Sequence, residues 1–415
     1  RGLGDVYKRQ KQCYGLNLQR CWMVLNLLAD QVVKGRIYPA LAQHQARPYT
    51  QGWREFGQHW PHTIPLRLQE YCDHHGVDIQ LYNINDVLPD RTYYPVGLGF
   101  FDFGIDYFAL MSSAVRKKLR TNQLRVLFYY HEGDNPARIK DRLDELAQDH
   151  LLPPDCYVFV SANTAAKNIP GFVYFADFEL WYWQRNQAIA PLPVHAQSRE
   201  HEFTVLNRLH KSWRATAMAD MHRQGLLNNS YWSYCETGNL GADNPIEIDS
   251  IPDLRPDTLS FLAGAPYTSD QLDQAQRNNH SETESKYHIN SYCNIVMETH
   301  WDADQSGGTF LTEKTFKPVK HGQLFFVAGP AGSLQALRDL GYKTFDTVLD
   351  TMYDRIEDNT QRWRRLCDAV DQARHRLADR FETARADIEH NQQLFAELKT
   401  QRLNSLIKDI HEQYN

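Results

Sequence analysis

The chain has 415 residues, a length that suggests two domains with a helical appendage. Hydrophobic residues make up 42% and charged residues 23%, which is ordinary for a globular protein. The formal net charge of −6 argues against nucleic acid as the main partner. The sequence contains no run of 18 apolar residues, so we expect no transmembrane helix.

The cysteine pattern indicates free thiols rather than disulfides or a zinc site. The number of cysteines is odd, their spacing is wide, and no C-x-x-C pair occurs. We therefore expect a reducing, cytoplasmic compartment. The seven cysteines are Cys13, Cys21, Cys72, Cys156, Cys235, Cys293 and Cys367.

The N-terminal region combines an unusual start with helical and strand patterns. Residues 1–10 (RGLGDVYKRQ) resemble a translated sequencing adapter, so we exclude them from fold reasoning. Apolar residues recur at helical spacing over Gln19–Arg36, which predicts an amphipathic core helix. A second helix is predicted over Leu66–His75, where Gly76 ends it. Alternation of apolar and polar residues predicts a strand over Val77–Ile84.

The clearest strand of the N-terminal half is Leu124–Tyr130 (LRVLFYY). It is preceded by residues 97–111, which are rich in Gly, Phe and Tyr and form either a strand, turn and helix or an active-site loop. After the strand, Asn135 can cap a helix that has Pro136 at its first position. The remaining predicted elements of this half are the helix running to His150, strands over Cys156–Ser161 and Phe172–Phe175, and an inter-domain linker over Ala188–Ser198.

The C-terminal half begins with a predicted strand over Glu202–Leu206 (EFTVL). Residues 236–286 are polar and weakly periodic, and they indicate an insertion with short helices. After Tyr353, apolar residues recur every three or four positions, which predicts helices to the end of the chain. Two further elements are predicted in this half, a helix over Ser212–Arg223 and a strand over Ser230–Tyr234.

The most informative pattern lies in residues 294–344. In chain order this block contains an apolar run over Ile295–Met297, Glu298, a Gly-rich loop, a short helix opened by Thr312-Glu313-Lys314, an apolar run over Leu324–Val327, a Gly329-Pro330 turn and a helix from Ser333 to Gly341. Alternating strands and helices predict a parallel α/β sheet. In such sheets, ligands bind at the carboxyl ends of strands, where helix N-termini face them.

Charged residues fall at that predicted edge. A carboxylate at the end of a strand, such as Glu298, can accept hydrogen bonds from sugar hydroxyls. Lys314 lies at a helix start next to free backbone N–H groups, where a lysine can hold a phosphate. The block therefore indicates a site for a phosphorylated sugar ligand.

This block resembles the nucleotide-sugar site of the alpha-1,3-fucosyltransferases and related GT-B glycosyltransferases. The resemblance implies that Glu313 binds the nucleotide ribose and Lys314 the pyrophosphate, and Glu298 matches the acidic residue at the end of the preceding strand. It covers about fifty residues, and Lys317-Pro318 and a longer loop depart from the family pattern. A basic residue at the earlier strand–helix junction touches the pyrophosphate in that family, which implies Arg208 or Arg214 here. The full predicted donor site is Asn207, Arg208, Arg214, Glu298, Thr312, Glu313 and Lys314.

Glycosyl transfer with inversion also needs a base for the acceptor hydroxyl. Glu132 follows the strand Leu124–Tyr130 and is our first candidate, and the resemblance places a Glu at a comparable strand end. Burial beside the neighbouring tyrosines would raise the pKa of Glu132. Asp134 and His131 are the alternatives for the base, and Glu132 could instead pair with Arg138.

Two other patterns are weaker. Asp302-Ala303-Asp304 is a D-x-D, which holds a divalent metal in other glycosyltransferases, but a solvated loop is the favoured interpretation and we expect no metal. The Gly329–Ser333 turn resembles a phosphate-binding turn, yet no Lys-Ser/Thr follows it, so a tight strand–helix turn is favoured.

The sequence predicts an α/β protein with two Rossmann-like domains of the GT-B type and a long C-terminal helical segment. The expected function is transfer of a sugar from a nucleotide-sugar donor, with a GDP-sugar favoured, to a carbohydrate acceptor. We expect the transfer to invert the anomeric centre and to need no metal or other cofactor. The alternative is a non-catalytic nucleotide- or carbohydrate-binding protein, and a metal-dependent transferase is a weaker third. The predicted segments after the adapter-like residues are 11–197 on the acceptor side, 198–350 for the nucleotide-sugar, and 351–415 as helices that pack back on the body.

Overall fold

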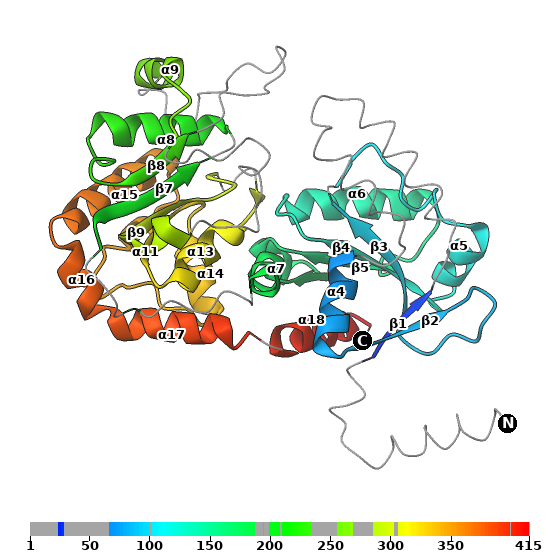
Figure 1. Ribbon diagram of the computed structural model, residues 1–415. Helices are drawn as coiled ribbons and strands as arrows, with labels where there is room; N and C mark the ends of the chain where they lie inside the picture. The colour runs from blue at the N-terminus through cyan, green and yellow to red at the C-terminus, as the bar shows by residue number, and fades with distance from the viewer. Residues whose placement is uncertain are drawn as a thin grey trace. The chain divides into compact units, whose positions relative to one another are not determined.

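The described part of the chain is an α/β protein with two parallel β-sheets (Figure 1). The chain divides into two compact units, of which unit 1 comprises residues 1–175 and 399–415 and unit 2 comprises residues 176–398. The computed structural model describes residues 24–28, 66–99, 101–186, 194, 199–207, 210–234, 255–268, 285–302, 306–398 and 400–414.

The sheet of unit 1 has the strand order β2-β1-β3-β4-β5-β6, and its neighbouring strands are all parallel. This is the order of a doubly wound sheet whose direction of winding reverses beside the first strand. The strands are β1 (Val24–Leu28), β2 (Asp78–Tyr82), β3 (Thr92–Leu98), β4 (Arg125–Tyr130), β5 (Tyr157–Ser161) and β6 (Phe172–Tyr174).

The helices of unit 1 include one whose start was predicted in detail. The Asn135 side chain accepts a hydrogen bond from the Ala137 N–H at 3.0 Å, and Pro136 is the first helical residue, so the predicted cap is confirmed. Gly76 has a φ of +68° directly after the first helix, which agrees with its predicted role as the stop. The helical elements are α4 (Leu66–His75), α5 (Ser113–Arg120), α6 (Pro136–Asp149), the short η2 (Thr164–Asn168) and α18 (Thr400–Glu412).

Helix α18 belongs to unit 1 although it lies at the C-terminal end of the chain. The Tyr93 hydroxyl donates to the Ile410 carbonyl at 3.0 Å. The hydroxyl of Tyr414, which follows α18, donates to the Thr92 carbonyl at 2.7 Å. These contacts attach the last helix to the amino end of β3, in the middle of the sheet.

The sheet of unit 2 has the order β10-β9-β7-β8 and is also parallel. Its strands are β7 (His201–Asn207), β8 (Tyr231–Tyr234), β9 (Ser291–Met297) and β10 (Leu324–Ala328). The described helical elements are α7 (Asp177–Arg185), α8 (Ser212–Arg223), α9 (Arg255–Ala263), α11 (Ser285–Ile289), α13 (Glu313–His321), α14 (Ser333–Asp339), η4 (Met352–Arg355), α15 (Asn359–Arg374), α16 (Leu377–Thr383) and α17 (Arg385–Ala396). The alternation predicted for residues 294–344 is therefore confirmed.

The predicted helix over Gln19–Arg36 is wrong where the structure describes it. Val24–Leu28 forms strand β1, which pairs with β2 on one side and β3 on the other. Three of its leucines are completely buried. An inner strand of a parallel sheet is covered on both faces and is therefore apolar throughout, so its periodicity does not distinguish it from a buried helix. The rest of the predicted helix lies outside the described residues.

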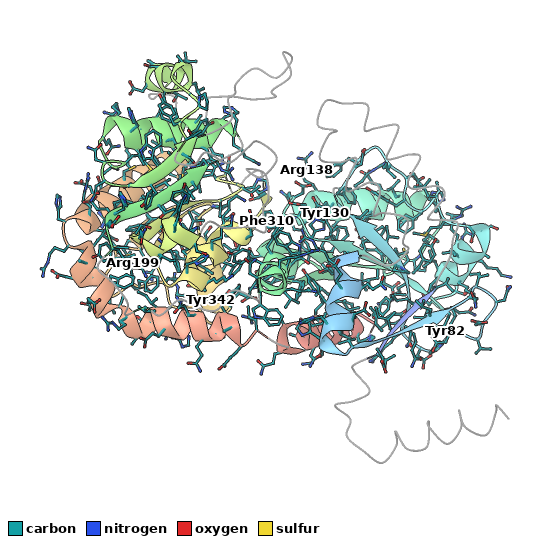
Figure 2. The ribbon with its side chains drawn as sticks, viewed as in Figure 1. Tyr82, Tyr130, Arg138, Arg199, Phe310 and Tyr342 are labelled. Carbon is teal, nitrogen blue, oxygen red and sulfur yellow. The ribbon has the colours of Figure 1, made fainter. Side chains whose placement is uncertain are left out.

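The boundary between the units lies at residues 175 and 176, before the linker predicted over 188–198. The reason is that α7 packs as part of unit 2. The Tyr342 hydroxyl (Figure 2) donates to the carboxylate of Glu179 on α7 at 2.7 Å. Lys320 Nζ donates to the carbonyl of Asn186, the residue after α7, at 3.1 Å. Most of the predicted linker lies outside the described residues.

Two findings bear on the broad class of the protein. Among the described helices, none has the length and the apolar character needed to cross a membrane. The cysteines within the described residues are buried free thiols, as predicted, and burial raises the pKa of both Cys72 and Cys156 to about 12. These described cysteines are Cys72, Cys156, Cys293 and Cys367.

Candidate functional site at the carboxyl edge of the second sheet

The strand order of the second sheet creates a switch point between β7 and β9. The chain continues from β7 to β8 on one side and from β9 to β10 on the other, so the two connections diverge at the carboxyl edge. We call this region the switch-point edge, and it comprises the carboxyl ends of β7 and β9 and the N-termini of α8 and α13. The predicted residues located there are Asn207, Arg214, Glu298, Thr312, Glu313 and Lys314, whereas Arg208 lies outside the described residues.

Glu298 is fully buried, and its carboxylate is engaged within the protein. Oε1 accepts hydrogen bonds from the Thr312 N–H at 2.9 Å and the Thr315 hydroxyl at 2.5 Å. Oε2 accepts from the Thr312 hydroxyl at 2.7 Å and the Thr299 N–H at 3.1 Å. We therefore revise its predicted role, because these internal donors take the place of the sugar hydroxyls. Glu298 fixes the start of α13 against the end of β9.

Arg214 connects α8 to the same point. Its guanidinium is buried and donates from Nε at 3.1 Å and from Nη2 at 2.6 Å to the backbone carbonyl of Glu298. Burial lowers the pKa of Arg214, and the nearby carboxylates of Glu298 and Glu313 oppose that shift. Arg214 therefore holds the two sides of the switch-point edge together.

Glu313 and Lys314 form an ion pair at the first turn of α13. Lys314 Nζ lies 3.1 Å from Glu313 Oε1 and donates to the Thr312 hydroxyl at 3.1 Å. The Lys314 side chain is 29% exposed, whereas that of Glu313 is 5% exposed. Lys314 is thus the more accessible member of the pair, and it places a cationic group beside a helix N-terminus.

The N-terminus of α8 also faces this edge and has no side-chain cap. Lys211 is the N-cap residue, and no side-chain hydrogen bond closes the first turn. The leading N–H groups of a helix without such a cap favour an anion or another acceptor.

Several side-chain nitrogens near this N-terminus are buried and have no hydrogen-bond partner among the described residues. They belong to Asn207 (Nδ2), His210 (Nε2), Trp213 (Nε1) and Trp301 (Nε1). The ring of Trp213, the second residue of α8, stacks on Trp301 with a centroid distance of 5.5 Å and an interplanar angle of 25°. Unpartnered buried polar groups of this kind are uncommon in folded proteins and need an explanation.

His210, Trp213 and Trp301 are not among the site residues predicted from the sequence. The run Asn207–Trp213, which contains several hydrogen-bond donors directly after a predicted strand, is the signal that identifies the first two. Trp301 follows β9 and is remote in sequence from α8, and its stacking on Trp213 shows that it reaches that helix.

A second group of titratable side chains lies in unit 1, at the carboxyl end of β4. The hydroxyl of Tyr130 (Figure 2) donates to the Asp134 carboxylate. His131 Nε2 lies 3.7 Å from Glu132 Oε1, and burial lowers the pKa of His131 well below its usual range. The Glu132 side chain is 39% exposed, so the burial considered for it in the sequence analysis is only partial. The Arg138 guanidinium, an alternative partner of Glu132 in the sequence analysis, lies 5.3 Å over the Phe103 ring.

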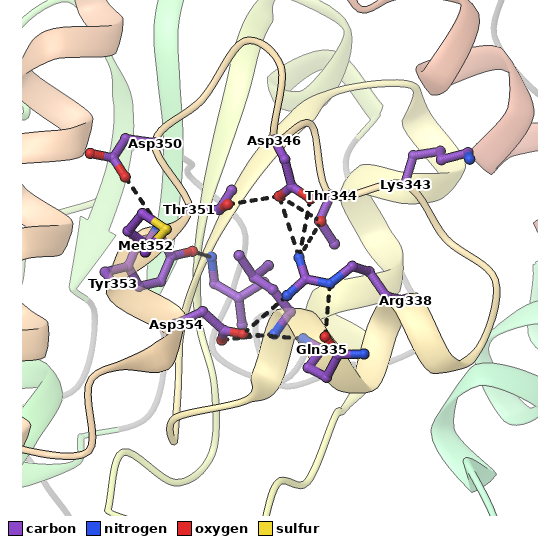
Figure 3. Close-up of polar contacts among 12 residues, drawn as sticks. Gln335, Arg338, Lys343, Thr344, Asp346, Asp350, Thr351, Met352, Tyr353 and Asp354 are labelled. Carbon is purple, nitrogen blue, oxygen red and sulfur yellow. Dashed lines mark hydrogen bonds and ion pairs between the residues drawn. The ribbon is translucent and has the colours of Figure 1, made fainter.

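The Gly329–Ser333 turn holds an internal carboxylate where a phosphate would bind (Figure 3). Asp354 Oδ1 accepts from the Leu334 N–H at 2.9 Å, and Oδ2 accepts from the Gln335 N–H at 3.1 Å. Arg338 Nη2 lies 3.7 Å from Asp354 Oδ2. The N-terminus of α14 is therefore satisfied internally, which confirms the predicted structural role of this turn.

The D-x-D pattern falls partly outside the described residues, since Asp302 is described and Ala303 and Asp304 are not. Within the part of the chain that the structure describes, no group of three or more His, Cys, Asp or Glu side chains is arranged to hold a metal ion.

Comparison with protein-family models, with curated proteins and with solved structures finds no match to this chain. The clues to the function of this chain are its own geometry and the resemblance in residues 294–344.

Proposed function

We propose that this chain is a GT-B glycosyltransferase that transfers a sugar from a nucleotide-sugar donor, with a GDP-sugar favoured, to a carbohydrate acceptor. The diphosphate of the donor would bind at the switch-point edge of unit 2. Two parallel sheets with switch points are compatible with the two Rossmann-like domains of that fold type.

The observation that carries the proposal is the connection between Lys314 and the N-terminus of α8. Arg214 on α8 binds the backbone of Glu298, the Glu298 carboxylate binds Thr312, and the Thr312 hydroxyl accepts from Lys314. A lysine and an uncapped helix N-terminus are thereby held at one strand edge. Both favour a diphosphate, and both would stabilise the charge that develops on it when the sugar leaves.

The other residues then take roles that follow from their positions. By resemblance, Glu313 would bind the nucleotide ribose, and Arg214 would position the site because its guanidinium is engaged with Glu298. Glu132 would deprotonate the acceptor hydroxyl for an inverting attack on the anomeric carbon, with Asp134 or His131 as the alternative base. We expect this reaction to proceed without a metal ion.

A thermal-shift panel tests the proposal. GDP, UDP, CMP and ADP are added with and without EDTA to the wild type, to Lys314→Ala and to Lys343→Ala, which removes an exposed lysine of the same unit. We expect stabilisation by one diphosphate, insensitive to EDTA, lost in Lys314→Ala and kept in the control. No shift with any nucleotide at millimolar concentration would refute the glycosyltransferase proposal, and a shift abolished by EDTA would favour a metal-dependent enzyme.

A further inference from the structure

We propose that His210 is a neutral Nε2–H donor that, together with the Trp213 indole N–H and the Asn207 side-chain amide, receives a phosphate oxygen of a diphosphate-containing ligand at the N-terminus of α8. This inference deepens the proposed function and rests on it, because the ligand would be the diphosphate of the same donor.

The contact with Tyr234 is the basis on which we assign the proton of His210 to one ring nitrogen. The Tyr234 hydroxyl lies 2.5 Å from His210 Nδ1. The backbone N–H of Lys211 hydrogen-bonds to the same hydroxyl, and we assign the hydroxyl as acceptor from Lys211 and as donor of its own hydrogen to Nδ1. A neutral imidazole whose Nδ1 accepts must carry its hydrogen on Nε2. Burial lowers the pKa of His210, which favours this neutral form.

The resulting Nε2–H is a donor without an acceptor. His210 Nε2 is buried and has no hydrogen-bond partner in the structure. The same is true of Trp213 Nε1 and of Asn207 Nδ2, and the Asn207 residue is only 2% exposed. A buried N–H that lacks an acceptor is unfavourable, and an added acceptor relieves that cost.

These three donors belong to one place in the fold. Asn207, the last residue of β7, is the register partner of Tyr234 on β8. His210 bonds to that same tyrosine, and Lys211 is the N-cap residue of α8. Trp213 lies in the first turn of the helix. The donors therefore belong to residues that lead into or begin α8, whose cap provides no side-chain acceptor.

The chemistry of the group favours phosphate over a sugar hydroxyl. Every unpartnered side-chain atom in it is a donor, so the ligand must supply acceptors, and a phosphate presents several on one centre. The dipole of α8 favours negative charge at the same point. These donors are neutral, and the buried Arg214 guanidinium is engaged with the Glu298 carbonyl. The group would therefore orient the diphosphate, while Lys314 supplies the opposite charge.

Titration calorimetry of the whole chain with inorganic pyrophosphate, GDP, UDP and the corresponding monophosphates tests the inference. The variants are His210→Ala and Trp213→Phe, and the second removes the indole N–H while it keeps a smaller aromatic ring against Trp301. His222→Ala is the matched control, because His222 lies in the last turn of the same helix and contacts Trp232. We expect each site variant to weaken the Kd for the diphosphate about tenfold, which is typical for one hydrogen bond to a charged group, and the control to leave the Kd unchanged.

The results of this titration distinguish failure of the inference from failure of the proposed function. Unchanged diphosphate affinity in both site variants overturns the inference, as does a wild type that binds neither pyrophosphate nor a nucleoside diphosphate at millimolar concentration. Binding of GDP or UDP that depends on His210, without binding of pyrophosphate, supports it and identifies a nucleotide as the source of the diphosphate. Binding that depends on His210, without transfer from any donor sugar, supports it while the proposed function fails. Sugar transfer that both variants leave unaffected supports the function and overturns the inference.

Thermal unfolding without ligand checks the fold of each variant, and Trp213→Phe serves as the test should His210→Ala not fold.

Discussion

The carboxylate of Glu298 accepts hydrogen bonds from both the backbone N–H and the hydroxyl of Thr312, at 2.9 and 2.7 Å. Thr312 is the N-cap residue of α13, and its side chain makes no capping bond within its own helix. The start of α13 is instead held by a residue 14 positions earlier, at the end of β9. This contact determines where Glu313 and Lys314 lie relative to the sheet.

Replacement of Glu298 should primarily cost stability. In Glu298→Gln, the amide NH₂ would face donors that now bind the carboxylate, so we expect the free energy of unfolding of unit 2 to fall by about 2–4 kcal/mol. Urea unfolding followed by tryptophan fluorescence measures the loss. Glu200→Gln, which removes an exposed carboxylate from the same unit, should stay within about 0.5 kcal/mol of the wild type. A variant of normal stability that loses nucleotide binding would instead restore the ligand role first predicted for Glu298.

Replacement of Asp354 should also lower the stability of the protein. Asp354→Ala leaves the N–H groups of Leu334 and Gln335 without their acceptor, and we expect a loss of about 1–3 kcal/mol. The matched control is Asp346→Ala, because Asp346 also contacts Arg338 but is 52% exposed. Its removal should cost at most about 1 kcal/mol. Similar losses in the two variants, measured by urea unfolding, would contradict the capping role.

The stacked pair His288 and His321 should make unit 2 acid-sensitive. The ring centroids lie 4.8 Å apart with an interplanar angle of 15°, and within the described part of the chain both buried Nε2 atoms have no hydrogen-bond partner. Burial lowers the pKa of His288 from 6.5 to about 4 and that of His321 well below its usual range, and the charges of Lys317 and Arg199 act in the same direction.

The direction of the pH dependence follows from how these histidines bind protons in the unfolded and the native protein. Below about pH 6.5 the unfolded chain binds protons at these histidines and the native protein does not, so the stabilisation present above that pH is lost as the pH falls toward 4. Each histidine contributes up to about 1.4 kcal/mol per pH unit. His321→Phe keeps a ring against His288 and should reduce the slope of unfolding free energy measured between pH 7 and 5. An unchanged slope would show that other groups cause the acid sensitivity.

Substitution of Glu132 distinguishes the glycosyltransferase proposal from the alternative of a non-catalytic binding protein. If Glu132 is the base, Glu132→Gln should abolish sugar transfer while leaving the affinity for the nucleotide unchanged, since Glu132 belongs to unit 1 and the proposed nucleotide site to unit 2. The measurement pairs donor turnover with calorimetric nucleotide binding.

Asp134→Asn is the companion variant, because Asp134 accepts from Tyr130 at the same strand end. Loss of transfer in Asp134→Asn alone would move the base to Asp134. Transfer that survives in both variants would exclude both carboxylates as the base, and a wild type that binds nucleotide but never transfers sugar would favour the binding-protein alternative.

Several elements of this chain can be predicted from short-range sequence patterns alone. The alternation of apolar runs, glycines and helix starts in residues 294–344 predicts β9, α13, β10 and α14 in order, because strand and helix periods differ and glycine ends helices. Asn135 and Pro136 likewise predict the start of α6 from neighbours alone. The same local logic placed Lys314 at a helix N-terminus.

Other features depend on residues that are distant in the sequence, and they become visible only in the folded protein. Val24–Leu28 is a strand because β2 and β3 cover its edges, and those strands come more than 40 residues later. Glu298 is a structural residue because the loop after it brings Thr312 to its carboxylate, whereas its position in the sequence fits a ligand contact equally well. His210 is oriented by a tyrosine on the next strand, and Trp301 reaches α8 through stacking on Trp213. A side chain's chemical role depends on which partners satisfy its polar atoms, and folding selects those partners across the chain.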